Sequence, residues 1–189
     1  MARVVVVGSF NVDHVWTSPQ LPRAGETRIG EYRTGPGGKG FNQATAAARA
    51  DAATAFICAL GDDAGGQLAR SLAGDDGIEL RADQVAVSTG TAGIYVDHAG
   101  NNSIMFGPGA NASLSVGFVR RNADVLSHSA VVLAQLESPV DAIGAAFQLA
   151  RESGALTVLN PAPADADLPA SLMALSDVIT PNESEFCGQ

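Results

Sequence analysis

Five short runs of apolar, mostly β-branched residues constrain the fold of this chain more than any other feature. They are VVVVG (4–8), ATAFICAL (53–60), AVVLAQL (130–136), ALTVLN (155–160) and DVIT (177–180). Most lack the polar alternation of a half-exposed strand, which predicts burial on both faces, as in a parallel sheet. Between them lie segments with helical patterns: 39–50, 63–74, 116–127, 139–153 and 167–175. This rhythm predicts an α/β fold with a doubly wound, mostly parallel sheet.

Two segments interrupt that rhythm, and both alternate between apolar and polar residues. Residues 11–34 hold VDHVW and TRIGEYRT around a turn-rich stretch, and residues 91–106 hold TAGIYV and NSIMF around the hairpin signature DHAGNN. The pattern predicts a small antiparallel sheet beside the parallel one. Such a sheet either covers a binding site as a lid or is an addition to the edge of the main sheet without a functional role. Two helix starts are also visible: Asp62-Asp63, and Ser138 as N-cap before Pro139 at the first helical position.

Composition excludes several function classes. The 189-residue chain has a net charge of -9, so nucleic acid is not an expected partner. No apolar run approaches the roughly twenty residues that a membrane span needs, and no signal-peptide pattern is present. The two cysteines and three histidines have no metal-ligand spacing, and no direct metal site is assigned. These observations predict a cytoplasmic protein.

The glycine-rich stretch TGPGGKGFNQ (34–43) imitates two nucleotide-binding motifs. Gly35, Gly37 and Gly40 match the dinucleotide fingerprint formally, with Asp62 further on as the ribose-binding acid. That fingerprint must follow a buried strand, however, and the polar RIGEYRT precedes this one. The phosphate-binding P-loop also fails, because Gly40 stands where Ser or Thr must bind magnesium. A dinucleotide site therefore stays a minor alternative.

Polar residues at this helix start and after the first strand suit a ligand with hydroxyl groups. Lys39, Asn42 and Gln43 share one face of the predicted helix, where the helix dipole adds positive potential. Asn11 and Asp13 follow the first strand and point the same way if that segment is extended. A carboxylate can accept from two neighbouring hydroxyls, as in a sugar diol. The alternatives are a solvated helix start and a turn that ends the strand.

Two further strand ends carry polar residues. Glu137 ends the run AVVLAQLE, and Asn182 and Glu185 share a helical face after the run DVIT. Carboxyl ends of parallel strands meet at one edge of the sheet, so these groups are expected in one crevice. That convergence predicts a binding site there more strongly than any single motif does.

The sequence resembles the ribokinase-like (PfkB-type) family of carbohydrate kinases over its whole length. The stretches that carry the resemblance are VVVVGSFNVDHV, PRAGET, GGKGFNQA, GDDAGGQLA, GPGANASLS, LAQLESP, LNPAPA and ITPNESE. The resemblance implies a doubly wound α/β domain with a β-sheet lid that often pairs across a homodimer. It implies that sugar hydroxyls are held by Asn11, Asp13, Gly38, Lys39, Gly40, Asn42 and Glu137. Asn182 and Glu185 match a motif that orders magnesium and the nucleotide phosphates.

The activity implied is transfer of the γ-phosphoryl group of ATP to the 5-hydroxyl of D-ribose, with Mg²⁺ and help from a monovalent cation such as K⁺. The alternatives are a kinase for another sugar or nucleoside, such as fructose, tagatose-phosphate or adenosine, and a non-catalytic sugar-binding or dimerising module. One family signature is missing: D-T-x-G-A-G-D, which supplies the catalytic aspartate and the anion hole, occurs nowhere in the sequence. The cation site comes with the same missing part.

The last residues, TPNESEFCGQ, open a helix that stops after barely a turn. The sequence is therefore expected to form one incomplete domain, residues 1–189, that holds the sugar-binding half of such a kinase. Negligible kinase activity is expected from it.

Overall fold

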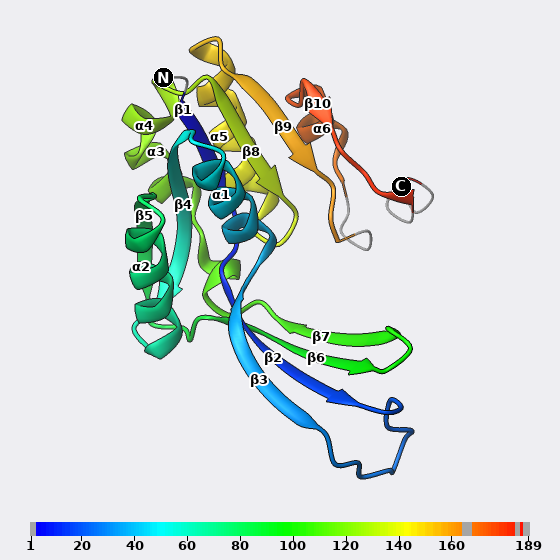
Figure 1. Ribbon diagram of the computed structural model, residues 1–189. Helices are drawn as coiled ribbons and strands as arrows, with labels where there is room; N and C mark the ends of the chain where they lie inside the picture. The colour runs from blue at the N-terminus through cyan, green and yellow to red at the C-terminus, as the bar shows by residue number, and fades with distance from the viewer. Residues whose placement is uncertain (1–2, 164–167, 184–185, 187–189) are drawn as a thin grey trace.

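A six-stranded parallel sheet forms the centre of the molecule in the computed structural model, which describes residues 3–163, 168–183 and 186 (Figure 1). Its strands, in spatial order, are β10 (Val178–Ile179), β9 (Leu156–Asn160), β8 (Val131–Gln135), β1 (Arg3–Val7), β4 (Ala53–Gly61) and β5 (Glu79–Val85). Every neighbouring pair is parallel. The five predicted strands are present. Strand β5 has no counterpart among them, because its sequence ELRADQV carries the charges of a half-buried edge.

Helices cover both faces of this sheet, which confirms the doubly wound α/β prediction. Helices α1 (Lys39–Arg49) and α2 (Ala64–Asp75) pack on one face with Val6, Phe56 and Leu60. On the other face, Val5, Val7 and Ile57 pack with residues from α3 (Val116–Arg121), α4 (Ala123–Ser127), α5 (Val140–Glu152) and α6 (Ala170–Ala174). Alternate residues of β1 and β4 thus enter different cores, as continuous apolar runs require.

Two details of the predicted helices are wrong. The helix expected over 116–127 is divided into α3 and α4 at Asn122, whose backbone is not helical and whose Nδ2 donates to the carbonyl of Phe118 at 3.0 Å. Helix α5 begins at Val140, so Pro139 occupies the N-cap position and Ser138 does not cap the helix. The Pro139 backbone is extended (ψ 129°), and its carbonyl accepts from the amides of Ala142 and Ile143.

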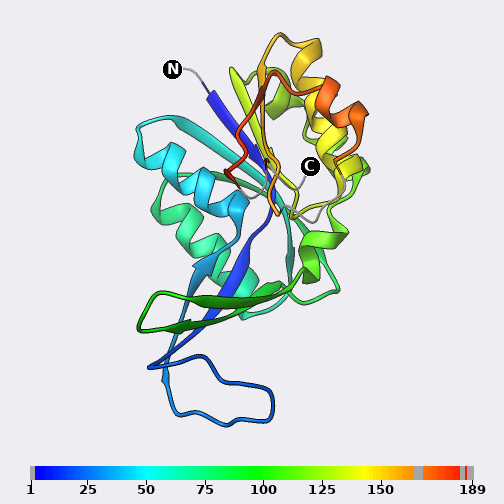
Figure 2. The ribbon, with the colours of Figure 1, turned by 90° about the vertical axis from the view of Figure 1, so that its right-hand side faces the viewer.

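A second sheet projects from one end of the main body, as both ribbon views show (Figures 1 and 2). Its spatial order is β3 (Glu31–Gly37), β2 (Asn11–Ser18), β6 (Gly90–Asp97) and β7 (Asn102–Gly107), and we call these four strands the lid sheet. The sheet is mixed rather than antiparallel, because β2 and β6 pair in parallel. Both strands leave the main body in the same direction, β2 after β1 and β6 after β5. The 3₁₀ helix η1 (Gly109–Ser113) follows β7.

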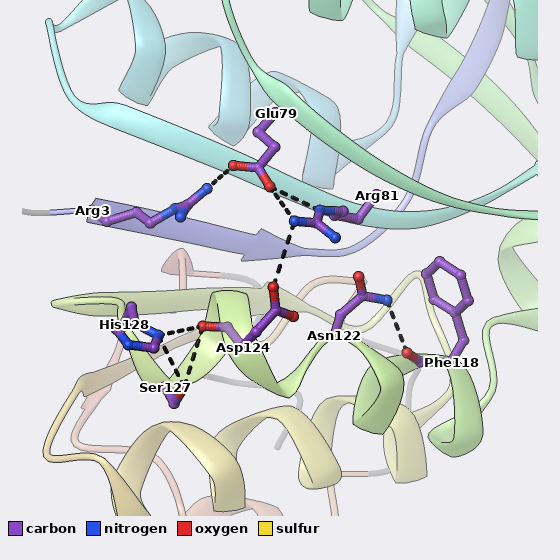
Figure 3. Close-up of polar contacts among 8 residues, drawn as sticks. All are labelled: Arg3, Glu79, Arg81, Phe118, Asn122, Asp124, Ser127 and His128. Carbon is purple, nitrogen blue, oxygen red and sulfur yellow. Dashed lines mark hydrogen bonds and ion pairs between the residues drawn. The ribbon is translucent and has the colours of Figure 1, made fainter.

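Polar contacts tie β1, β5 and α4 together (Figure 3). The carboxylate of Glu79 pairs with both Arg3 and Arg81, and Arg81 Nη2 lies 3.6 Å from Asp124 Oδ2. These side chains are partly exposed, so each pair contributes at most about 1 kcal/mol. In the described part of the chain, no helix is both long and apolar enough to cross a lipid bilayer.

Asp63 joins the start of α2 to the segment that enters the lid sheet. Its Oδ1 accepts from the amide of Gly66 at 2.9 Å, as the predicted helix cap should, and its Oδ2 accepts from the amide of Thr89 at 2.7 Å. The Thr89 hydroxyl also donates to Oδ1 at 2.6 Å. Burial raises the pKa of Asp63, but the hydrogen bonds from Thr89 and Gly66 outweigh it, and the pKa lies below its usual value.

Asp63→Ala is therefore expected to lower the free energy of unfolding by about 1–3 kcal/mol, because a helix cap and two further hydrogen bonds are lost. Since the folded-state pKa is depressed, this stabilisation is present above the usual pKa of 3.8 and is lost as the pH falls through the lower, folded value. Urea unfolding at neutral and acidic pH measures both effects. Asp62→Ala is the matched control, because the adjacent Asp62 is exposed, and a similar loss there would contradict the assignment.

Candidate functional site

A cavity of about 270 Å³ lies between the lid sheet and the start of α1. Its polar lining consists of Asn11, Asp13, Gly38, Lys39, Asn42 and Glu137. Its apolar lining comes from β6 and β7 of the lid sheet: Ala92, Ile94, Ile104 and Phe106. Six of the ten residues singled out in the sequence thus line one cavity, and a covering role for the lid sheet follows from the apolar lining.

The cavity lies beside the switch point of the parallel sheet. The next strand of this sheet along the chain, β4, lies on one side of β1. Strand β8 lies on the other side of β1. Ligands of open α/β sheets bind outside the carboxyl ends of strands at such a point. Ser9, after β1, donates its hydroxyl to Glu137 Oε2, after β8, at 2.6 Å. The same Glu137 oxygen accepts from the backbone amide of Lys39 at 3.0 Å.

Ser9 is fully buried and was not predicted as a site residue. Its hydroxyl joins β1 to Glu137 and also accepts from the amide of Gly40 at 3.3 Å. The only local signal was a small polar residue directly after a buried strand, in GSFNVD.

The glycines of the loop serve close packing between backbone segments. Gly38 has a φ of +90°, which L side chains rarely adopt, and it precedes the first residue of α1. A Cβ on Gly40 would lie 2.5 Å from the Ser9 nitrogen, and one on Gly37 would lie 2.2 Å from Asp13 Oδ1. Gly40 is buried and is not among the residues that line the cavity, so its predicted contact with sugar hydroxyls stays a prediction. Its amide already donates to Ser9.

Asn11 and Asp13 reach the cavity from the same face of β2, as the period-two argument predicts. Burial raises the pKa of the Asp13 carboxyl, the negative charge of Glu137 raises it further, and His14 offsets part of this. The ammonium group of Lys39 makes no ion pair with the other described residues. The cavity therefore offers carboxylate acceptors together with a cation that forms no ion pair within the described part of the chain.

Besides Gly40, two predicted residues that the structure describes do not line the cavity. Gln43 turns from the cavity to Gln135, whose Nε2 donates to Gln43 Oε1 at 2.5 Å. Asn182 is exposed beyond β10, and β9 separates that strand from β8, so it does not join the cavity lining. Glu185 lies outside the described residues. Within the described ranges, no three His, Cys, Asp or Glu side chains gather as metal ligands would.

Comparisons with known proteins agree with this architecture. Residues 1–187 match the family described as pfkB family carbohydrate kinase. The chain is 40% identical to a ribokinase of Haemophilus influenzae, over 96% of this chain and 60% of that protein. It is also 40% identical to a ribokinase of Mus musculus, over 97% of this chain and 58% of that protein. The chain thus spans about three fifths of the length of these curated relatives.

Solved structures show the same likeness. The ribokinase of Arabidopsis thaliana complexed with ribose and ATP superposes with a TM-score of 0.87 at 30% identity, over 99% of this chain and 62% of that one. A ribokinase of Giardia lamblia gives a TM-score of 0.91 at 32% identity, over 97% and 58%. With the family match over nearly every residue, this chain belongs to the pfkB family of carbohydrate kinases.

Proposed function

We propose that this chain forms the sugar-binding part of an ATP-dependent kinase of the ribokinase type, with D-ribose as the sugar and its 5-hydroxyl as the phosphoryl acceptor. The observation that carries the proposal is the cavity at the switch point, which sets polar side chains against an apolar lid surface. The Arabidopsis relative that was solved with ribose and ATP supports the choice of substrates.

The lining has the hydrogen-bonding groups that a sugar needs. Asp13 accepts from hydroxyls, whereas the Lys39 ammonium and the Asn42 amide can donate to them. The Asn42 side chain lies one turn after Lys39 on α1, so both can reach the same ligand. Ile94 and Phe106 cover the opposite side and would exclude water from the bound sugar.

The nucleotide half of the reaction is assigned by family resemblance alone. Asn182 and Glu185 would face the phosphates of ATP and their Mg²⁺ ion, which neutralises the charge on the phosphates. A K⁺ ion would assist. We assign the general base to none of the residues described, since the signature D-T-x-G-A-G-D does not occur in the sequence. The proposed compartment is the cytoplasm, which supplies ATP.

The lid sheet is also the proposed contact with a second copy of the chain. On β7, the side chains of Ile104 and Met105 are 59% and 79% exposed. Successive residues of a strand point to opposite faces, so Ile104 faces the cavity and Met105 faces away from it. An exposed apolar side chain on the outer face of an edge strand favours association. Sedimentation equilibrium should detect a dimer, and Met105→Glu should weaken it.

Titration calorimetry tests the proposed substrate. Ribose is expected to release or absorb heat and to bind more tightly than fructose or adenosine. Tighter binding of one of the other ligands would make that ligand the proposed substrate in place of ribose, and no binding of any of them would contradict a sugar site. A coupled kinase assay then separates the working enzyme from a sugar-binding module, for which binding occurs without turnover.

A further inference from the structure

Asn111, in η1, makes a set of hydrogen bonds that the proposed sugar contacts do not explain. It is fully buried, and it does not line the cavity. Its Oδ1 accepts from the amide of Phe10 at 3.0 Å, and its Nδ2 donates to the carbonyl of Phe10 at 3.1 Å. The same Nδ2 donates to Asn11 Oδ1 at 2.8 Å. These bonds connect the segment that leaves the lid sheet with the point where β1 passes into β2.

These contacts determine which way both side-chain amides face. A backbone N–H can only donate, so the Asn111 atom beside the Phe10 amide must be the oxygen. The Asn111 amino group therefore faces the other way, and its two protons go to Phe10 O and to Asn11. Because that group can only donate, the Asn11 atom beside it must also be an oxygen. The Asn11 amino group is then left for the cavity that Asn11 lines.

We propose that Asn111 is a positioning residue that holds Asn11 with its amino group toward the sugar, an inference that rests on the proposed function. Asn11 then offers a donor close to the acceptor carboxylate of Asp13, two residues along the same face of β2. One sugar hydroxyl can accept from Asn11 and donate its single proton to Asp13. With the amide reversed, two acceptors would face that hydroxyl, and one of them would remain unsatisfied.

Gly90 of β6 provides the space for this pair. It lies opposite Asn11 in the register of β2 and β6. A Cβ on Gly90 would lie 2.3 Å from Asn111 Nδ2 and 2.4 Å from Asn11 Oδ1. The hydrogen bond between the two asparagines therefore needs a glycine at this position. This requirement supports the pairing of Asn111 with Asn11 independently of the hydrogen-bond distances.

Asn111→Asp tests the inference, because it keeps the acceptor for Phe10 and removes both donors. The Asn11 amide is expected to turn its amino group to the new carboxylate and its oxygen to the cavity. In calorimetry, ribose affinity should fall by about tenfold or more, since one hydrogen bond becomes a contact between two acceptors. The wild type should bind ribose more tightly than it binds a deoxyribose that lacks the hydroxyl beside Asp13. The variant should lose this preference.

Asn122→Asp is the matched control. Asn122 is buried, and its Nδ2 also donates to a backbone carbonyl, that of Phe118 (Figure 3). It lies at the junction of α3 and α4 and does not line the cavity. The control should keep its ribose affinity within about twofold. If Asn111→Asp behaves like this control, the positioning role is wrong.

NMR of the side-chain amides in sugar-free protein keeps the two proposals separate. In the wild type, the amino protons of Asn11, which line the cavity, should exchange with water faster than those of Asn111, and ribose should slow the Asn11 protons. Exchange at Asn11 as slow as at Asn111 without sugar would overturn the positioning role, even if the variant does not fold. If ribose does not bind at all, the proposed substrate fails, and the exchange pattern in sugar-free protein still decides the orientation.

Discussion

Asp13→Asn is expected to weaken ribose binding by about ten- to a hundredfold and to stabilise the folded chain at neutral pH. Hydrogen bonds to a charged group are worth about 1.5–3 kcal/mol, and each 1.4 kcal/mol is a factor of ten in affinity. The carboxylate of Asp13 is the proposed acceptor for sugar hydroxyls in the cavity. Asparagine can reproduce only part of that acceptor capacity. Calorimetry measures the affinity, and urea unfolding measures the stability.

The stability gain follows from the pKa of Asp13. Burial and the charge of Glu137 raise that pKa above 3.8. The charge of His14 lowers it, but by less. A raised pKa means that the folded chain binds the proton more tightly than the unfolded chain. The negative charge therefore opposes folding at pH values above the raised pKa, and this penalty disappears as the pH falls toward 3.8. Asparagine removes the penalty at every pH.

The same shift predicts how binding depends on pH. Ribose affinity should decline on acidification at a pH above the usual range of an aspartate, because protonated Asp13 accepts fewer hydrogen bonds. The Asp13→Asn variant should lack this decline. Asp75→Asn is the control, since Asp75 is exposed at the end of α2 and does not line the cavity. Unchanged ribose affinity in Asp13→Asn would show that Asp13 does not bind the sugar. A lower free energy of unfolding in that variant would show that the Asp13 carboxylate stabilises the fold.

Local sequence patterns were sufficient for five of the six strands of the main sheet, all except β5, and for part of the cavity. Residues such as Val5 and Val6 face different cores, so continuous apolar runs identify buried parallel strands. The period-two rule placed Asn11 and Asp13 on one face of β2, where both line the cavity. These predictions succeed because they depend on residues that are close together in the sequence.

Other features depend on contacts between distant residues and have no local signal. Ser9 contacts Glu137 across 128 positions, and Asn111 contacts Asn11 across 100. The chain topology brings these side chains together, and a single sequence does not report it. The same reason applies to Gln43: it shares a helix face with Lys39, but Gln135, on β8, offers it a partner. The parallel pairing of β2 and β6 likewise follows from where the two strands leave the main body.

Gly40→Ala is expected to lower the free energy of unfolding by about 1–3 kcal/mol, as overpacking against immobile atoms does. The new Cβ would lie 2.5 Å from the Ser9 nitrogen and 2.7 Å from the Gly8 carbonyl carbon. Both are backbone atoms of the segment that follows β1, so no flexible side chain can move aside. Displacement of Ser9 would also disturb its hydrogen bond to Glu137, and ribose affinity should fall with stability. Urea unfolding and calorimetry measure the two effects.

Gly144→Ala is the matched control, because Gly144 also lies in a helix and a Cβ there would meet nothing within 4 Å. Alanine at such a position should stabilise the chain by about 0.5–1 kcal/mol, since glycine loses more backbone entropy on folding. The same substitution is therefore expected to have opposite signs in α1 and α5. Similar effects of the two substitutions would mean that α1 can move away from β1. In that case the contact between Gly40 and Ser9 would not fix the position of Lys39 at the cavity.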